Sequence, residues 1–180
     1  IRQSMPKKIV EIGVAEGGTT CVIMNCLKIL SLDSIVYSVD LTEKLYYDVS
    51  LNTGYEYEKL KNMIGIKGTH KLLVGKTIAG QINTVGADID LVIIDTTHRL
   101  PGELLDFLAV LPYVSPGAMI VLHDVNLNCI RTSSAEKNVI LKSREDIASK
   151  VLFMTVVADK YINRNENNIT ASNIAAVSVT

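Results

Sequence analysis

Short apolar runs alternate with amphipathic stretches along most of the chain, and this alternation predicts its fold. The apolar runs are rich in β-branched residues, and the stretches between them repeat apolar residues at helical spacing. Predicted strands cover residues 8–12, 35–40, 69–75, 90–95 and 118–124. Predicted helices cover residues 19–30, 56–64, 77–85 and 100–111, and a turn is expected at Ser115–Gly117. Strands that alternate with helices form a mostly parallel sheet through right-handed crossovers, so we expect an α/β, doubly wound, Rossmann-like sheet.

The C-terminal part of the chain follows a different pattern. Residues 126–138 have no clear period, and we interpret them as a surface loop. Ser143–Asp146 is typical of a helix start, and an apolar segment follows it at 147–157. Residues 160–163 and 172–179 predict a final pair of strands around a polar turn. The sheet should therefore end in an antiparallel C-terminal strand.

Composition limits the class of protein and its partners. The chain has 180 residues, of which 48% are hydrophobic, and its mean hydropathy is +0.26. These values suit one domain, residues 1–180, with a single core. No apolar run reaches the length of a membrane span. The formal net charge of −1 gives no electrostatic support for nucleic acid or an anionic membrane as the main partner.

The cysteines bear on the cellular compartment of the protein, and the start of the chain bears on whether it is part of a longer protein. Cys21, Cys26 and Cys129 form no paired framework and no C-x-x-C motif, so a reducing, cytoplasmic compartment is expected. No signal peptide is visible, and the chain begins at Ile1 without an initiator Met. We expect that an N-terminal cap over the substrate is missing or that the chain is cut from a longer protein.

A glycine-rich turn between the first strand and the first helix is the first candidate site, with Gly13, Ala15, Gly17 and Gly18. Small residues let a ligand approach the backbone, and a helix start offers free N–H groups. The glycine spacing departs from the G-x-G-x-x-G of dinucleotide-binding turns. Glu11 would repel a pyrophosphate but suits a cationic ligand such as S-adenosylmethionine (SAM). A tight strand–helix connection without a ligand is the alternative.

Polar residues follow the predicted strands, where parallel strands place ligands. Asp40 ends the second strand, the usual place of an acid that binds ribose hydroxyls; a helix cap or a solvated loop acid is the alternative. His98 and His123 are candidates for a role in the site. Alternatively, His98 only forms a hydrogen bond where a helix begins, and His123 is only a structural residue at a strand end. The polar strand-end residues expected to converge on one edge are Glu11, Asp40, Gly75, Lys76, Asp95, Thr96, Thr97, His98, His123, Asp124 and Asn126.

Four of the chain's tyrosines lie in residues 41–65, a stretch that is irregular at first and then forms the predicted helix at 56–64. They are Tyr46, Tyr47, Tyr55 and Tyr57. This segment is interpreted either as a lid over the site or as a loop pinned by its own aromatic side chains.

Residues 11–18, 39–40, 94–98 and 117–124 together resemble class I SAM-dependent methyltransferases. More narrowly, they resemble methyltransferase family 24, which is related to cephalosporin hydroxylase-like and macrocin O-methyltransferase-like proteins. The resemblance covers about Pro6 to Asn128. Its more specific parts are Asp95-x-x-His98 and the His123–Asp124 pair.

The resemblance implies roles for individual residues. The turn would hold the methionine part of SAM, Asp40 would bind the ribose, and Gly75 and Lys76 would lie by the adenine. Asp95 would face both the sulfonium and the acceptor. The implied cofactor-binding residues are Glu11, Gly13, Ala15, Gly17, Gly18, Asp40, Gly75, Lys76 and Asp95.

The resemblance also implies a possible metal site. In metal-dependent O-methyltransferases of this superfamily, carboxylates after the fourth and fifth strands bind magnesium, and Asp95 and Asp124 match these positions. His123 stands where a second carboxylate often stands. Magnesium prefers oxygen ligands, whereas imidazole suits zinc, iron or nickel. Either the site is metal-free, with His98 or His123 as general base, or the metal is not magnesium.

The expected function is SAM-dependent O-methylation of a saccharide or other small-molecule hydroxyl (EC 2.1.1), with Asp95, His98 and His123 as catalytic residues. Because similar proteins occur beside bacterial glycosyltransferases, the resemblance implies glycan modification. The expected partner is this acceptor, with a second copy of the chain or the rest of a multidomain protein. The alternatives are an NAD-dependent oxidoreductase, which Asp40 suits and the glycine spacing does not, and a non-catalytic SAM-binding module of a glycan-synthesis protein.

Overall fold

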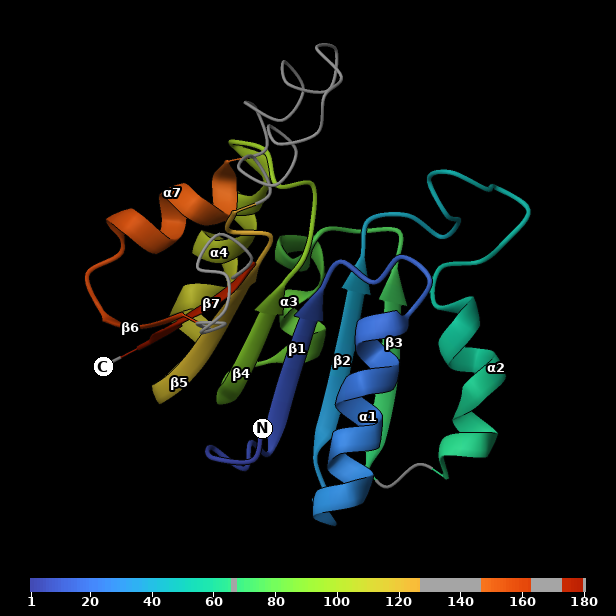
Figure 1. Cartoon of the computed structure of the whole chain (residues 1–180). Coiled ribbons are helices and arrows are strands. Elements are labelled where there is room, and N and C mark those ends of the chain that lie inside the picture. The colour runs from blue at the N-terminus through green and yellow to red at the C-terminus, as the bar shows by residue number, and fades with distance from the viewer. Residues whose placement is uncertain (66–67, 127–146, 163–172, 180) are drawn as a thin grey trace, which may run out of the picture.

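The computed structural model of the protein describes residues 1–65, 68–126, 147–162 and 173–179. Within these ranges, seven strands form one sheet in the order β3-β2-β1-β4-β5-β7-β6 (Figure 1). The strands are β1 (Lys8–Ile12), β2 (Ile35–Asp40), β3 (Thr69–Val74), β4 (Ile89–Ile94), β5 (Val114–His123), β6 (Asp159–Ile162) and β7 (Ile174–Ser178). The helices are α1 (Gly18–Leu30), α2 (Tyr55–Ile64), α3 (Ile78–Val85), α4 (Gly102–Val110), the short 3₁₀ helix η1 (Leu111–Tyr113) and α7 (Ala148–Thr155).

The strand order confirms the doubly wound sheet. Strands β1 to β5 are parallel, and β7 runs antiparallel to both β5 and β6. The chain builds β1, β2 and β3 outward on one side and then crosses to β4 on the other. The strand order therefore reverses between β1 and β4, which is where sheets of this kind bind ligands.

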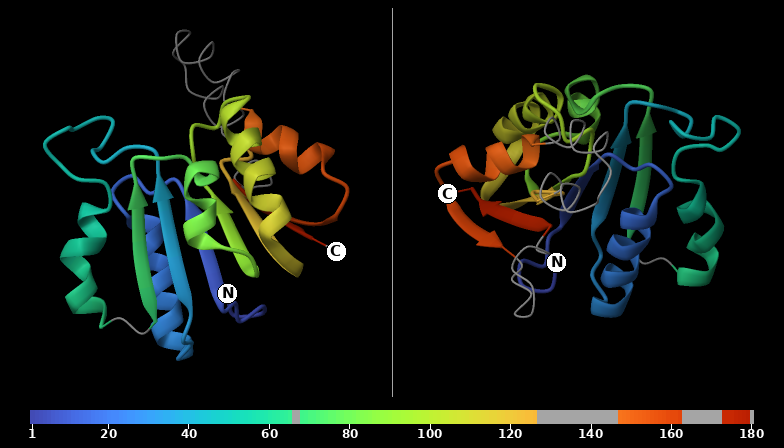
Figure 2. Two further views of the ribbon diagram at one scale, coloured as in Figure 1. Left: turned by 180° about the vertical axis from the view of Figure 1, so that it is seen from behind. Right: turned by 45° about the horizontal axis from the view of Figure 1, so that its top comes forward.

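Two apolar cores cover the two faces of the sheet. Helices α1 and α2 lie on one face, and α3, α4 and α7 lie on the other (Figure 2). The strand side chains alternate between these cores: Ile9 packs with α1, whereas Val10 and Ile12 pack with α3, α4 and α7. Leu27 of α1 and Phe107 of α4 are among the buried side chains, and each stabilises the fold by about 2 kcal/mol through burial.

The register of the parallel strands aligns their carboxyl ends. Ile12 pairs with Val39 on one side and with Ile94 on the other, and Ile94 pairs with Leu122. The residues that follow these four therefore stand in one row. They are Gly13, Asp40, Asp95 and His123.

The structure corrects the expected start of β5. The predicted turn at Ser115–Gly117 lies within this strand, which begins at Val114. The pairing of β5 with β4 shifts between Ile89 and Leu91, which marks a bulge. Gly117 has a φ of 80° and its N–H donates to the carbonyl of Val179 at 2.6 Å, so the glycine bends the strand and does not end it.

Two further expectations have mixed outcomes. The helix predicted at 100–111 is shorter, since α4 spans Gly102–Val110 with Pro101 as its N-cap residue. The predicted final strand pair is confirmed by β6 and β7, and α7 falls within the apolar segment at 147–157. The interpretations of residues 127–138 and Ser143–Asp146 lie outside the described residues.

Gly13 is the glycine that this architecture constrains most closely. Its φ is 90°, and a Cβ there would lie 1.9 Å from the backbone oxygen of Asp95. We expect Gly13→Ala to lower the free energy of unfolding by roughly 2–4 kcal/mol, because it combines backbone strain with a backbone clash. Gly18→Ala is the matched control, since a Cβ at that helical position meets nothing within 4 Å. Urea denaturation measures both, and equal midpoints for the two variants would contradict the prediction.

Candidate functional site

The glycine turn joins β1 to α1 and is held in left-handed backbone conformations. Gly13, Ala15 and Gly17 have φ angles of 90°, 47° and 95°. The N–H of Gly13 donates to the carbonyl of Val39 at 2.9 Å, which ties the turn to β2. Helix α1 begins at Gly18 without a side-chain cap, so the N–H groups of its first turn are left for a ligand.

Asp40 ends β2, and its carboxylate holds the same turn. Oδ2 accepts the N–H groups of Val14 at 2.9 Å and Ala15 at 3.2 Å. Oδ1 accepts the N–H of Thr42 at 2.9 Å. The structure thus places this acid beside the glycine turn and not at a helix start. Oδ1 also accepts the hydroxyl of Thr42 at 3.1 Å, so the roughly four lone-pair positions of the carboxylate are all engaged. A ligand hydroxyl would bind by displacing this exposed Thr42 contact.

Glu11 lies beneath the turn on the α1 face of the sheet and is fully buried. Its Oε2 accepts the hydroxyl of Thr20 at 2.6 Å and the hydroxyl of Ser38. Its Oε1 is buried and has no hydrogen-bond partner among the described residues. Burial raises the pKa of Glu11 to about 7, although the hydrogen bonds from Ser38 and Thr20 oppose this shift. Glu11, which the sequence predicts to bind the cofactor, therefore lies buried beneath the glycine turn.

His70, for which the sequence indicates no role, extends this buried network. Its Nε2 lies 3.0 Å from Ser38 Oγ, and its ring makes an edge contact with Tyr57 at 4.4 Å between centroids. Burial lowers the pKa of His70 to about 4, so the ring is neutral near pH 7.

Asp95, His98, His123 and Asp124 form one cluster at the ends of β4 and β5, which we call the Asp–His cluster. Nε2 of His98 lies 3.1 Å from Asp124 Oδ2 and 3.6 Å from Asp95 Oδ1. Nδ1 of His123 lies 3.2 Å from Asp95 Oδ1 and 3.3 Å from Asp124 Oδ1. Ligand atoms of Asp95, His98 and Asp124 all lie within 4.8 Å of one another, which is close enough to hold one metal ion.

The carboxylates of the Asp–His cluster set its protonation. The neighbouring Asp124 and Asp95 raise the pKa of His123 to about 10. Burial would lower the pKa of His98, but Glu103, Asp124 and Asp95 outweigh it and raise that pKa above its ordinary value. Burial would raise the pKa of Asp124, and the two histidines more than offset it, so this pKa is lowered. The cluster therefore favours positive charge between its two aspartates.

Glu103 is a site residue that the sequence analysis missed. It is fully buried in the first turn of α4, where an acid ordinarily serves only the helix N-terminus. Its Oε2 accepts the backbone N–H of His98 at 3.1 Å and lies 3.3 Å from His98 Nδ1. The ring N–H does not point directly at that oxygen, so the second contact is electrostatic. Ser149 of α7 donates its hydroxyl to Glu103 Oε1.

Gly75 and Lys76 lie at the outer side of the predicted site, next to Asp40, which pairs with Val74 in the register of β2 and β3. They follow β3, the outermost strand on their side of the sheet, and both are exposed. The side chain of Lys76 lies against Gly80 in α3. Among the described residues, no hydrogen bond or ion pair links them to the Asp–His cluster, and their predicted place by an adenine stays a prediction.

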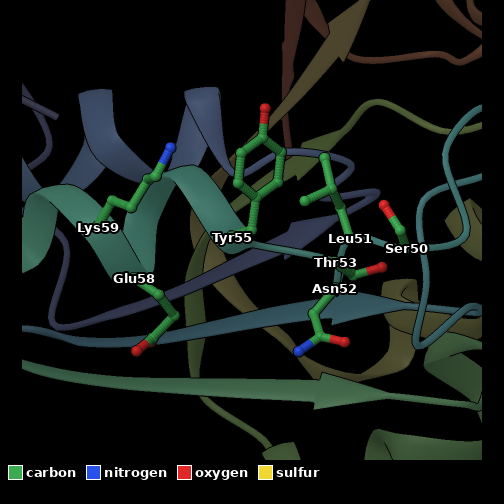
Figure 3. A pocket seen from close by; sticks show the side chains of 7 residues that line it. All are labelled: Ser50, Leu51, Asn52, Thr53, Tyr55, Glu58 and Lys59. Carbon is green, nitrogen blue, oxygen red and sulfur yellow. The ribbon is translucent and has the colours of Figure 1, made fainter.

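The tyrosine-rich segment is attached to the glycine turn. Tyr47 donates its hydroxyl to Glu16, and the N–H of Gly54 donates to the carbonyl of Ala15 at 2.8 Å. A pocket of about 400 Å³ lies where this segment meets α2 (Figure 3). Its lining contains none of the predicted site residues, being formed by Ser50, Leu51, Asn52, Thr53, Tyr55, Glu58 and Lys59. The candidate site is thus the open sheet edge and not this pocket.

The fold and the site together define a class of protein. A parallel sheet with β7 inserted antiparallel between β5 and β6, and a glycine turn at its switch point, is the class I SAM-dependent methyltransferase fold. Residues 10–125 match the family model described as "Methyltransferase domain", so the chain belongs to this methyltransferase family.

Solved structures agree with this fold. The O-methyltransferase TomG from Streptomyces achromogenes, crystallised with SAM, is 16% identical with a TM-score of 0.62, covering 99% of this chain and 76% of TomG. The methyltransferase PaMTH1 from Podospora anserina, bound to S-adenosylhomocysteine (SAH), is 12% identical with a TM-score of 0.66, covering 99% of this chain and 74% of PaMTH1. No curated protein matches the chain. Over the described part of the chain, no helix combines the length and apolarity needed to cross a bilayer.

The raised pKa of Glu11 predicts how stability changes with pH. The folded protein binds the Glu11 proton more tightly than the unfolded chain, whose carboxyl has a pKa near 4.5. The stability that this proton contributes is therefore fully present below pH 4.5 and is lost as pH rises to about 7. We expect Glu11→Gln to remove a loss on the order of 3 kcal/mol across this window.

Denaturant titrations at several pH values measure this effect as the difference between wild type and variant. That difference isolates Glu11 from the titration of the two cluster histidines. Glu43→Gln, at an exposed position, should leave the pH dependence as it is in the wild type. A Glu11→Gln variant with the wild-type pH dependence would show that this carboxyl keeps an ordinary pKa.

Proposed function

We propose that the protein transfers the methyl group of SAM to a hydroxyl oxygen of a small molecule, such as a saccharide. One observation supports the proposal most strongly. Because of the strand register, the glycine turn, Asp40 and the Asp–His cluster lie side by side at one edge of the sheet. The side chains in this row include several carboxylates and no lysine or arginine. Such a row suits a ligand with a sulfonium and an ammonium group. The family match supports methyl transfer over the nicotinamide-dependent alternative.

The residues fit SAM as a cofactor. TomG was crystallised with SAM and PaMTH1 with SAH, and both share this fold. Gly13 allows close backbone approach, and the uncapped start of α1 offers N–H groups to the methionine carboxylate. Asp40 would accept a ribose hydroxyl in place of the exposed Thr42 hydroxyl. Oε1 of Glu11 is buried beneath the turn and has no hydrogen-bond partner among the described residues, so the deprotonated form of this carboxyl would favour a nearby ammonium group.

The Asp–His cluster also fits a divalent metal. Asp95, His98 and Asp124 would hold the ion, since their ligand atoms converge within 4.8 Å. When bound, such an ion orients an acceptor hydroxyl and lowers its pKa. The imidazole in this set favours a transition metal over magnesium, which prefers oxygen ligands.

The chain's own residues align the reactants and take up the proton. The methyl carbon is already activated by the sulfonium, so the protein contributes mainly alignment and a proton acceptor. The C–S bond breaks as the C–O bond forms, which yields SAH and a methyl ether. When no metal is bound, the hydroxyl proton passes to Nε2 of His98 in its neutral form, which faces Asp95. His123 is not the acceptor, because its pKa of about 10 leaves the ring already protonated near pH 7. Asp95, next to the turn, faces both the cofactor and the acceptor.

Cofactor binding is tested by titrating SAM into the intact protein by calorimetry. Asp40→Asn should weaken binding about 10-fold or more, because hydrogen bonds to a charged acceptor are the stronger ones. Asp33→Asn is the matched control, since this exposed acid precedes the opposite end of the same strand. The absence of binding at millimolar SAM would eliminate the proposed function.

Methyl transfer is tested with isotope-labelled SAM and a panel of hydroxylated acceptors that includes saccharides. His98→Ala and Asp95→Asn should each lower kcat by roughly 100-fold, because each removes a group that acts at the reacting atoms. For His98→Ala, the affinity for SAM should change much less than kcat, whereas Asp95→Asn also removes a charge that faces the cofactor. If SAM binds but both variants leave every activity of the protein unchanged, the non-catalytic module becomes the better account.

A further inference from the structure

We propose that Glu103 is a positioning residue that makes His98 a ligand for a divalent transition-metal ion, held together with Asp95 and Asp124. The inference rests on the metal site proposed above, and it concerns a residue that no motif in the sequence indicates. Glu103 acts through His98, whose backbone and imidazole ring it contacts.

The burial of Glu103 is unusual for its position. An acid in the first turn of a helix stabilises that helix from an exposed site, and burying a carboxylate is costly unless specific partners compensate. The partners of Glu103 are few and directed. Oε1 accepts the hydroxyl of Ser149, and Oε2 faces both the backbone N–H and the ring Nδ1 of His98. The buried carboxylate is thus directed at Ser149 and His98.

The backbone of His98 is held from two helices. His98 has a φ of 58°, a left-handed conformation that bulky residues seldom adopt unless their surroundings impose it. Its N–H donates to Glu103 of α4, and its carbonyl accepts the N–H of Ala148 of α7 at 3.0 Å. Since Ser149 also holds Glu103, both helices act together on His98.

The ring of His98 lies between Glu103 and the two aspartates. Nδ1 lies 3.3 Å from Glu103, and Nε2 lies 3.1 Å from Asp124 and 3.6 Å from Asp95. A neutral imidazole carries a single N–H. With that N–H on Nδ1, it lies on the side of Glu103 and is attracted to it without forming an aligned hydrogen bond. The lone pair of Nε2 then faces the carboxylates of Asp95 and Asp124. A cation between these groups makes the arrangement favourable, as in the carboxylate–histidine–metal relays of metalloproteins.

The donor set defines the class of ion. One imidazole nitrogen and two carboxylate oxygens converge. Imidazole suits zinc, cobalt and nickel, whereas magnesium demands oxygen ligands in octahedral geometry. The site should therefore take Co²⁺ or Zn²⁺ in preference to Mg²⁺.

The test measures binding of Co²⁺ by its visible absorption, using the full chain without SAM or acceptor. Glu103→Gln should weaken Co²⁺ binding by roughly 10- to 100-fold, the usual effect of losing a residue that orients a metal-bound histidine. Ser149→Ala removes only the hydroxyl that supports Glu103. Its effect on Co²⁺ binding should be several-fold smaller than the effect of Glu103→Gln. Glu43→Gln is the control, because it removes an exposed carboxylate that has no described contact with His98 or Glu103. It should bind Co²⁺ as the wild type does.

A second readout separates positioning from a merely structural role. In the Zn²⁺-loaded protein, the His98 Nδ1–H resonance in a ¹H–¹⁵N spectrum should lie downfield because it faces a carboxylate. It should move upfield in Glu103→Gln, and thermal unfolding shows whether that variant is folded. If it is not, Ser149→Ala carries the comparison.

Three results would overturn the inference. Glu103→Gln and Ser149→Ala could bind Co²⁺ as tightly as the wild type, the His98 resonance could stay in place, or the wild type could bind neither Co²⁺ nor Zn²⁺. None of these results bears on the calorimetric titration with SAM, so failure of this inference is distinguishable from failure of the proposed function.

Discussion

Parallel register is the constraint on which the rest of the structure depends. Ile12 pairs with Ile94, and Ile94 pairs with Leu122, so the residues that follow these three must lie together at one edge of the sheet. A shift of one residue in any of these pairings would turn a strand's side chains to the opposite face and remove its last residue from the row. The chemistry of the site is thus specified by the hydrophobic strands, and the polar residues depend on that alignment.

Two buried carboxylates lie beneath this edge, one on each face of the sheet, and they differ in kind. Glu11, on the α1 face, shares one oxygen between two hydroxyls and leaves the other without a partner, so burial dominates its pKa. Glu103, on the other face, uses both oxygens and directs them at Ser149 and His98. Burial of a charge is unfavourable by itself, so each carboxylate indicates a place where the fold gives up stability for local electrostatics.

Much of the fold could be predicted from the sequence, because strand and helix periodicities are local signals. The bounds of β2 and the end of α2 at Gly65 follow from such signals. The row of strand-end residues could also be predicted, since it follows from parallel topology alone. The turn expected at Ser115–Gly117 was wrong because a Pro-Gly pair is compatible with a bulged strand, and only the pairing with β4 and β7 decides between them.

The missed parts of the site share a different physical origin. Glu103 lies in a helix and Ser149 lies 46 residues further along the chain, and their contact depends on how α4 and α7 pack. Nothing in local composition separates Glu103 from an ordinary helix-start acid. Asp40 shows the same limit: its place after β2 indicates a ligand, but its hold on Val14 and Ala15 is visible only in three dimensions.

The support of His98 from α7 has a consequence for where this domain ends. The family match stops at residue 125, yet the N–H that holds the carbonyl of His98 belongs to Ala148. A fragment trimmed to the limits of the match would keep every recognisable motif and lose the scaffold behind its central histidine. In this protein the boundary of similarity falls short of the boundary of the working unit.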